Sequence, residues 1–273
     1  MADNTSALQV IGLSAGYNGR PVVHDIDFEI APGEVVALLG SNGAGKTTLL
    51  SAIAGLIKPL GGTVRLDGRD VTGKAAHKLA RAGIALVPED RSLFLDLTAR
   101  ENLLVASPRG GARKSEERVL GMLPELKKCL GRKAGLLSGG EQQMLAVGRA
   151  LVSTPRVLIV DEVSLGLAPV VVDRLLPVLK DVAEKLDAGV LIVEQHVPRA
   201  LEIASRALVI AHGRIVLQGT SEQLRADPEL IASSYLGDIA TAAALEPDLV
   251  ATDDPVATTD SATTRKTRAR RAR

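Results

Sequence analysis

The spacing of apolar and polar residues along the chain predicts alternating strands and helices. Residues 8–30 alternate apolar and polar side chains around turn-forming residues at 16–20, which predicts two antiparallel strands. Short, fully apolar runs have the composition of strands buried on both faces, at 35–39, 84–87, 157–160 and 190–193. Because helical patterns separate these runs, we expect an α/β fold with a parallel sheet covered on both faces and an antiparallel β subdomain beside it.

Smaller elements complete this pattern. Helical patterns are present at 46–57 and 175–186, and the second is expected to end with Gly189 as a C-cap. Short β segments are expected at 63–66, before an Asp-Gly turn, and in a hairpin at 208–217.

Composition divides the chain into a folded part and a tail. Residues 1–237 are long enough for one large domain. From approximately 93 to 152 they show helical pattern interrupted by Pro, Gly and charged residues, which we interpret as an inserted helical subdomain. The chain then turns to Ala, Thr, Asp and Pro and ends in a basic run. Such a composition cannot bury a core, so we expect 238–273 to be a disordered tail with a basic end.

A glycine-rich loop joins the first apolar run to the helical pattern behind it. Residues 40–47 read Gly-Ser-Asn-Gly-Ala-Gly-Lys-Thr, a complete phosphate-binding loop in the strand–loop–helix context that such a loop requires. Its glycines let backbone amides point at phosphate oxygens, and the helix start adds its own unpaired amides. Lys46 is expected to reach the β- and γ-phosphates during catalysis, and Thr47 to hold Mg²⁺. The alternative, an ordinary glycine-rich turn, does not explain the intact spacing.

This loop predicts a P-loop NTPase (RecA-like) core that binds a nucleoside triphosphate. The expected nucleotide-binding residues in and beside the loop are Gly40, Ser41, Asn42, Gly43, Ala44, Gly45, Lys46, Thr47 and Thr48.

Two carboxylates follow the apolar run at 157–160. Asp161 and Glu162 are expected at the carboxyl end of a buried strand, where ligands bind in open α/β sheets. Asp161 suits the positioning of Mg²⁺, and Glu162 can polarise the attacking water as a general base. Taken alone, such a pair would be interpreted as solvent-exposed residues at the end of a strand. Because a phosphate loop precedes it in this chain, we interpret the pair as catalytic.

A second glycine-containing helix start lies at 137–143, Leu-Ser-Gly-Gly-Glu-Gln-Gln. It predicts a helix N-terminus with exposed amides, which can close over the γ-phosphate of a nucleotide held by another copy of the fold. The alternative is a capped structural helix with a glycine entry. The residues expected to contact nucleotide here are Ser138, Gly139, Gly140, Glu141 and Gln142.

Composition excludes several other classes of protein. Aromatic residues make up 1% of the chain, which argues against base-stacking platforms for single-stranded nucleic acid. The tail and the remainder of the chain each carry nearly balanced charge, so no broad basic face is implied. Cys129 is the single cysteine, which fits a reducing compartment. No secretion signal and no apolar run approaching about 20 residues is present, so we expect a soluble, cytoplasmic protein.

With these motifs in this order, the chain resembles the ATP-binding-cassette (ABC) ATPases over roughly residues 8–237. The resemblance implies that Tyr17 stacks on adenine and that His196 is the switch histidine that contacts the γ-phosphate. It also places Glu89 at the position of a glutamine that helps to sense Mg²⁺. The implied site is then catalytic at Glu162, His196 and Lys46, with Thr47, Glu89 and Asp161 around the metal and ATP and Mg²⁺ as cofactors.

Departures from the general ABC pattern narrow the resemblance. Glu89 replaces the glutamine, Ala168 stands where an aspartate is common, and Val163 replaces a proline. The first two, with the sequence at 137–146, resemble the ATPase subunits of branched-chain amino-acid uptake systems and of related systems for urea and short-chain amides.

The resemblance implies a set of partners and a location. They are a second ABC ATPase subunit (in a hetero- or homodimer), two integral-membrane permease subunits and, indirectly, an extracytoplasmic substrate-binding protein. The chain would then lie on the inner face of the cell membrane, held there through the permease, with no nucleic acid expected. A soluble ABC protein of DNA repair or translation remains an alternative, supported by the basic tail alone, as does a nucleotide-binding regulator that no longer hydrolyses.

Overall fold

The computed structural model describes residues 6–108 and 110–234; the tail predicted at 238–273 lies outside the described residues. The strands are β1 (Leu8–Tyr17), β2 (Arg20–Ile30), β3 (Val35–Leu39), β4 (Gly61–Leu66), β5 (Arg69–Asp70), β6 (Ile84–Val87), β7 (Val157–Asp161), β8 (Gly189–Glu194), β9 (Arg206–Ala211) and β10 (Arg214–Thr220). The helices are α1 (Lys46–Ile53), α2 (Ala76–Ala82), α3 (Ala99–Ala106), α4 (Ala112–Met122), α5 (Gly139–Leu151), α6 (Pro169–Leu186), α7 (Val197–Ile203) and α8 (Ser221–Ala226), with 3-10 helices at Pro124–Lys128 and Ala134–Leu136.

A central sheet carries the functional ends of the strands. Within the described residues its order is β10-β9-β3-β8-β7-β6, with β10 antiparallel and the other pairs parallel. The predicted parallel sheet is therefore confirmed, and so is the hairpin at 208–217. Because β3, β8, β7 and β6 are neighbours in this order, their carboxyl ends meet at one edge of the sheet.

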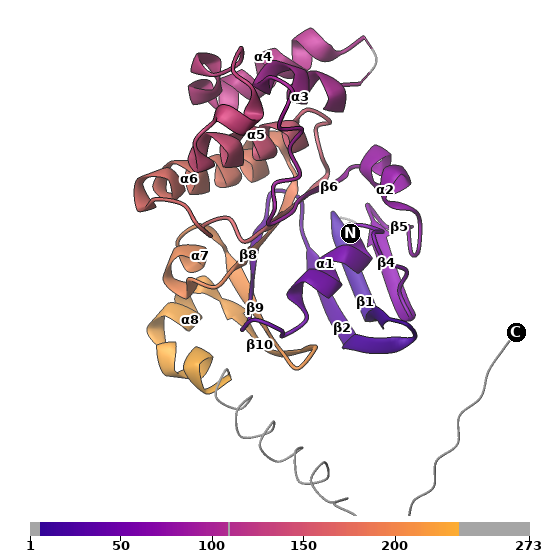
Figure 1. The fold of residues 1–273 in the computed structure, drawn as a ribbon. Coiled ribbons are helices and arrows are strands. Elements are labelled where there is room, and N and C mark those ends of the chain that lie inside the picture. Colours follow the sequence, from indigo (N-terminus) through magenta and orange to yellow (C-terminus); the bar gives the residue numbers. More distant parts are fainter. Residues whose placement is uncertain (1–5, 109, 235–273) are drawn as a thin grey trace, which may run out of the picture.

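Core residues lie on both faces of the central sheet, as the apolar strands predicted. On one face α6 and α7 pack against alternate strand residues such as Ala37, Leu158 and Ile192. On the other, α1 and an antiparallel sheet of order β2-β1-β4-β5 pack against residues such as Leu38 and Ile159. Figure 1 shows this antiparallel sheet, in indigo and purple, beside the central strands.

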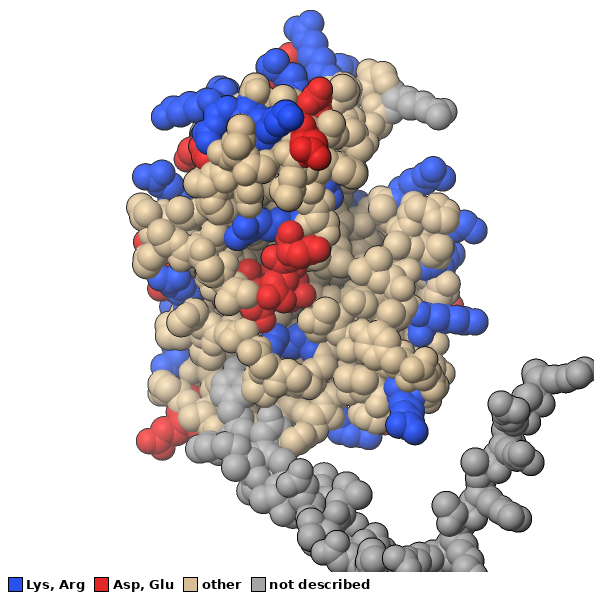
Figure 2. All heavy atoms as spheres, viewed as in Figure 1, with Lys and Arg blue, Asp and Glu red and all other residues tan. Residues whose placement is uncertain are grey.

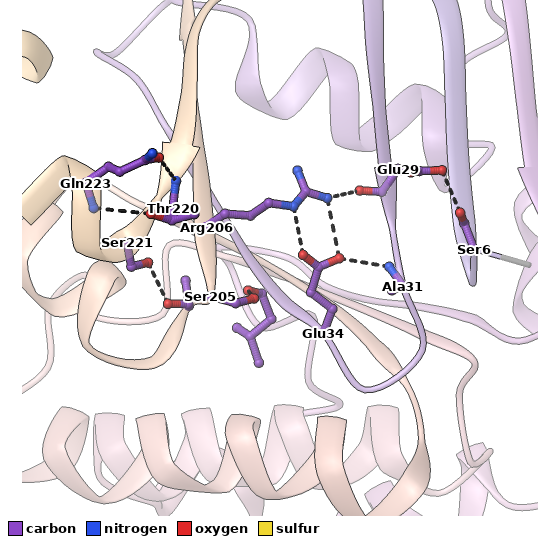
Figure 3. Close-up of polar contacts among 11 residues, drawn as sticks. Ser6, Glu29, Ala31, Glu34, Ser205, Arg206, Thr220, Ser221 and Gln223 are labelled. Carbon is purple, nitrogen blue, oxygen red and sulfur yellow. Dashed lines mark hydrogen bonds and ion pairs between the residues drawn. The ribbon is translucent and has the colours of Figure 1, made fainter. Parts of the chain in front are cut away.

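A polar network joins the antiparallel sheet to the central sheet (Figure 3). Arg206, at the start of β9, forms an ion pair with Glu34 at 2.7 Å, and Glu34 accepts the backbone N–H of Ala31 at 2.8 Å. The guanidinium also donates to the backbone carbonyl of Glu29, at the end of β2, whose carboxylate accepts from Ser6. These contacts tie the end of β2 to the start of β9, and so join the antiparallel sheet to the central one.

The described residues from 93 to 152 contain α3, α4, α5 and both 3-10 helices, and no strand. Figure 1 shows these helices together at one end of the molecule, away from the antiparallel sheet. The bounds of an inserted subdomain remain a prediction.

Two predicted helix ends are wrong. Helix α1 ends at Ile53 rather than Ile57, because Gly55 takes a φ of +72° that the helix cannot continue through. Gly189 does not cap α6: Asp187 takes the left-handed conformation there, and Gly189 begins β8. A Cβ atom on Gly189 would lie 2.9 Å from Ile30, so close packing between the two sheets explains this glycine.

Candidate functional site

The loop at 40–45 is shaped by its glycines and by its neighbours. Gly43 and Gly45 have φ values of +84° and +106°, which favour glycine. No side chain caps the N-terminus of α1, so the first amides of this helix are left for a ligand. A Cβ atom on Gly40 would lie 2.7 Å from the carbonyl oxygen of Ile210, so β9 holds the loop closely.

Lys46 crosses the loop. Its ammonium donates to the backbone carbonyls of Gly40 at 2.9 Å and of Ser41 at 3.0 Å, and the residue is buried. Because both bonds are to the phosphate loop itself, the positive charge of Lys46 is held at the loop, where it can attract a phosphate.

A cavity of about 550 Å³ opens in front of the loop. Tyr17, half exposed at the end of β1, lines this cavity, and so do Glu89 and Glu162. The structure thus brings together predicted site residues from four separate segments. The predicted residues that line the cavity are Tyr17, Asn42, Gly43, Gly45, Lys46, Thr47, Thr48, Glu89 and Glu162.

Asp161 has an unusual environment at the end of β7. Its side chain is buried, and its Oδ1 atom has no hydrogen-bond partner. The pKa of Asp161 is raised to about 6, chiefly by burial and also by the nearby charges of Glu162 and Glu89, whereas Lys46 and the Thr47 hydroxyl act in the opposite direction. A buried, unpartnered oxygen beside a hydroxyl and further carboxylates is a donor set that suits a hard divalent cation such as Mg²⁺.

Figure 2 shows acidic side chains gathered at the centre of one face of the molecule. No group of three or more His, Cys, Asp or Glu residues that could hold a metal was found among the described residues. A cation at Asp161 would therefore have at most Glu89 as a second carboxylate ligand, and would take the others from Thr47, from water and from phosphate oxygens.

Glu162 is held by a residue that the sequence did not suggest. The side-chain amide of Gln195 donates to Glu162 Oε1 at 2.7 Å and to Asn42 Oδ1 at 3.0 Å, so Gln195 joins the carboxylate to the phosphate loop. Glu162 itself has a φ of +49°, a conformation found mostly at turns and functional sites. The backbone turns there, so Asp161 and Glu162 face different surroundings.

The segment after Glu162 is anchored by a second residue that the sequence did not suggest. Glu194 is buried at the end of β8 and accepts two hydrogen bonds from Ser164, one from the hydroxyl at 2.7 Å and one from the backbone N–H at 2.9 Å. Burial raises the pKa of Glu194, and the bonds from Ser164 oppose that shift. His196 follows β8, is exposed, and lines a neighbouring cavity of about 370 Å³ that shares Glu162 and Gln195 with the first.

The residues at 138–142 begin α5 as predicted but lie apart from this cavity. Ser138 accepts the backbone N–H of Glu141, and the Glu141 carboxylate accepts that of Ser138, a reciprocal capping box. The Gln142 amide donates to the carbonyl of Ala134. None of these residues lines the cavity at the phosphate loop, so the structure does not bring Ser138 and Lys46 into one site within a single chain.

The sheet order, the phosphate loop and the carboxylates at the end of β7 define the protein as a P-loop nucleoside triphosphatase. The ABC transporter family model matches residues 23–164, just over half of the chain. The chain belongs to the ABC transporter family, and it is an ATP-hydrolysing ATPase of that family.

Individual relatives match over most of their length. The high-affinity branched-chain amino acid transport ATP-binding protein BraG of Pseudomonas aeruginosa is 38% identical over 228 residues, 82% of this chain and 97% of BraG. The lipopolysaccharide export system ATP-binding protein LptB of Acidithiobacillus ferridurans is 34% identical, over 85% of this chain and 97% of LptB. The ADP conformation of MJ1267, an ATP-binding cassette of an ABC transporter, superimposes with a TM-score of 0.75 at 25% identity, over 85% of this chain and 99% of that one.

These comparisons confirm the predicted family and the predicted ABC ATPase fold. In the described part of the chain, no helix is both long and apolar enough to cross a membrane.

Proposed function

We propose that this chain is the ATP-hydrolysing subunit of an ABC importer that takes up branched-chain amino acids across the cytoplasmic membrane. The choice of substrate rests on similarity over nearly the full length of two proteins named for branched-chain amino acid transport. They are BraG and the probable LivF of Archaeoglobus fulgidus, each 38% identical to this chain. Glu89, at a position where glutamine is usual in ABC ATPases, supports the same assignment.

Within this proposal each residue of the cavity has a role. Tyr17 stacks on adenine, the amides of residues 40–48 and Lys46 bind the phosphates, and Asp161, Thr47 and Glu89 hold Mg²⁺. When bound there, Mg²⁺ would supply positive charge that offsets the negative charge of the phosphates. Glu162, held by Gln195, orients and polarises the attacking water, and His196 contacts the γ-phosphate from the neighbouring cavity.

The residues at 138–142, which begin helix α5, can contact a nucleotide only in a second ATPase subunit. They do not line the cavity of their own chain, so a helix start that closes over the γ-phosphate comes from a partner cassette. Closure of the pair then completes the catalytic arrangement, which couples hydrolysis to association.

The permease is expected to dock near segment 88–108. Phe94, Leu95, Leu104 and Val105 are about half exposed, which is unusual for large apolar side chains this close together in the chain. Val105 also lines a groove of about 1030 Å³ whose other walls come from β6 and α5. Two permease subunits would hold the chain on the inner face of the membrane, and a substrate-binding protein would act on the outer side.

Two other transport roles have specific support. Uptake of urea or short-chain amides fits the same sequence variants, and export of lipopolysaccharide fits the similarity to LptB, at 34% identity. A non-transport ABC ATPase has less support, because it rests on the basic tail alone.

Uptake of radiolabelled leucine tests the proposal. Cells that lack the gene are complemented with the parent chain or with Glu162→Gln, and restoration by the parent alone is the expected result. Uptake that never depends on the gene would refute the branched-chain assignment, and urea and short amides would then be tested in the same cells.

A further inference from the structure

A second cavity reaches the residues proposed to hold Mg²⁺. We call this cavity, of about 940 Å³, the metal-side cavity. Asp161 lines the metal-side cavity but does not line the cavity of about 550 Å³ at the phosphate loop. Thr47 and Glu89 line both cavities. The proposed metal ligands therefore lie at the boundary between two openings rather than at the end of one.

The Asp161 carboxylate is incompletely bonded. Asp161 is 4% exposed, and its Oδ1 atom has no hydrogen-bond partner among the described residues. A buried carboxylate oxygen in that state calls for a ligand, since almost all buried polar atoms in proteins have a partner. Because Asp161 lines the metal-side cavity and not the cavity at the phosphate loop, that ligand can approach from the metal-side cavity.

The walls of the metal-side cavity suit a hydrated cation. Glu89 and Asp90 are exposed there, and the Asp90 carboxylate is held in place by the Ser92 hydroxyl, which donates to Oδ1 at 2.7 Å. Mg²⁺ gives up its bound waters reluctantly, so a passage for it has to be wide as well as negatively charged. Small or apolar side chains make up much of the remaining wall, namely Ala54, Ala76, Ala80, Ile84 and Leu86.

Two arginines also line the metal-side cavity, and both are bonded to uncharged groups. Arg91 Nε donates to Gln143 Oε1 at 2.8 Å, and Arg149 Nη1 donates to the carbonyl of Ser92 at 2.6 Å. Among the described residues that line the cavity, three carboxylates stand against these two guanidiniums. The balance of charge therefore favours a cation over an anion.

A bound nucleotide closes the other approach. In the proposed binding mode the nucleotide fills the cavity between Tyr17 and the phosphate loop, and so stands between solvent and Thr47. Neither Tyr17 nor Lys46 lines the metal-side cavity, so this second opening stays free. The phosphates add negative charge beside Thr47 and strengthen the attraction of a cation through that opening.

We propose that the metal-side cavity is the entrance through which Mg²⁺ reaches Asp161 and Thr47 while a nucleotide is bound. Glu89 and Asp90 attract the hydrated cation at this entrance, and the small side chain of Ala80 keeps it open. The cation can then enter and leave without release of the nucleotide. This inference rests on the proposed metal site and does not depend on the transported substrate.

Mn²⁺ and a mant-labelled ATP make the entrance measurable without hydrolysis. The full chain with Glu162→Gln, in excess over mant-ATP and free of divalent cations, is mixed rapidly with Mn²⁺, which quenches the fluorophore when it binds nearby. We expect a quenching rate that rises linearly with the Mn²⁺ concentration and exceeds the dissociation rate of mant-ATP, measured with a chase of unlabelled ATP. A rate that levels off at that dissociation rate would overturn the inference, because the cation would then enter only after the nucleotide had left.

Ala80→Trp tests where the entrance lies. Ala80 is exposed on α2 and lines the metal-side cavity, so a large ring there should slow quenching about tenfold while the Kd of mant-ATP without metal stays within about twofold of the parent value. Ala82→Trp is the matched control. Ala82 is exposed on the same helix but does not line the metal-side cavity, so this variant should quench as fast as the parent.

Asp90→Asn tests the charge of the entrance without adding bulk. It should slow quenching about threefold and weaken the dependence of the rate on ionic strength. Asp96→Asn removes an exposed carboxylate that does not line the metal-side cavity, and should have no such effect. If Ala80→Trp and Asp90→Asn both quench as fast as the parent, the cation enters elsewhere and the inference is wrong.

These measurements fail separately from the transport assay. A parent chain in which Mn²⁺ never quenches bound mant-ATP would overturn the metal site and its entrance together. Leucine uptake that does not depend on the gene would refute the transported substrate and leave the quenching results unchanged, because they need only the purified chain.

Discussion

The Ser164 hydroxyl donates to the buried Glu194 carboxylate at 2.7 Å, which ties the segment after Glu162 to the end of β8. Ser164→Ala leaves that carboxylate with one fewer partner. We expect it to lower the free energy of unfolding by about 1–3 kcal/mol, and to lower kcat because residues 163–168 lose their anchor. Urea unfolding and steady-state kinetics measure the two effects.

Ser153→Ala is the control for that variant. Ser153 is exposed and donates to the carbonyl of Ala150, so its removal should change stability by less than about 0.5 kcal/mol. Equal effects of the two substitutions would show that Glu194 does not need Ser164.

The turn between β9 and β10 supports the phosphate loop. The Gly213 N–H donates to the Ala44 carbonyl at 3.0 Å, and since the C=O and N–H of one peptide group point in opposite directions, this bond turns the Gly45 N–H toward the cradle. A Cβ atom on Gly213, whose φ is +71°, would lie 2.0 Å from the Val22 carbonyl oxygen. Gly213→Ala should lower the Tm and weaken ATP binding together.

Gly12→Ala is the control for Gly213→Ala, because it introduces backbone strain without a steric clash. Gly12 also has a positive φ, +56°, but a Cβ atom added there would meet nothing within 4 Å. The substitution should cost about 1–2 kcal/mol for the left-handed conformation and leave the Kd for ATP unchanged. If both variants lose the same stability and both bind ATP normally, the turn does not shape the loop.

The stability of the nucleotide-free protein should depend on pH through Asp161. Its pKa is raised from 3.8 to about 6, so the folded protein binds this proton more tightly than the unfolded chain does. The stabilisation that results is present below about pH 4 and is lost as pH rises through about 6. Without Mg²⁺, Asp161→Asn should therefore be more stable than the parent at pH 7.5, by about 1–3 kcal/mol after discounting for solvent screening.

Urea unfolding of both proteins at pH 4.5 and pH 7.5 checks this difference. Adding Mg²⁺·ATP should reverse the order at pH 7.5, because the bound cation stabilises the ionised carboxylate of the parent alone. Identical pH dependence of the two proteins would contradict the assigned environment of Asp161.

Tyr17 should affect binding rather than chemistry. It lines the cavity but holds no group that can take part in hydrolysis, so Tyr17→Ala is expected to raise the KM for ATP about tenfold through lost stacking, with little change in kcat. Tyr17→Phe keeps the ring and should behave as the parent does. An unchanged KM in Tyr17→Ala would place adenine elsewhere.

Local sequence patterns were sufficient for much of the fold and the site. The strands at 35–39 and 157–161 and the loop between Gly40 and Thr47 are coded by contiguous residues, and parallel strands that are neighbours necessarily bring their carboxyl ends together. The cavity that joins Tyr17 to Lys46 and Glu162 follows from that geometry.

Residues that act through distant partners could not be found in this way. Gln195 contacts Asn42, 153 positions away, and Arg91 contacts Gln143, 52 positions away, and neither pair has a spacing that marks it. The end of α1 at Ile53 and the cap of α6 at Asp187 were missed for a related reason. A glycine in the sequence does not show whether it caps a helix or allows a neighbouring strand to pack closely.

The capping box at the start of α5 limits which residues can replace Ser138. Its oxygen accepts the Glu141 amide, and its hydroxyl lies beside the Glu141 carboxylate, whose pKa the hydrogen bonds with Ser138 lower. An aspartate would cap this helix equally well, yet it has no proton to donate and would repel a phosphate. In the proposed contact with a partner's γ-phosphate, this one atom would accept from the helix and donate to the phosphate, which only a hydroxyl can do.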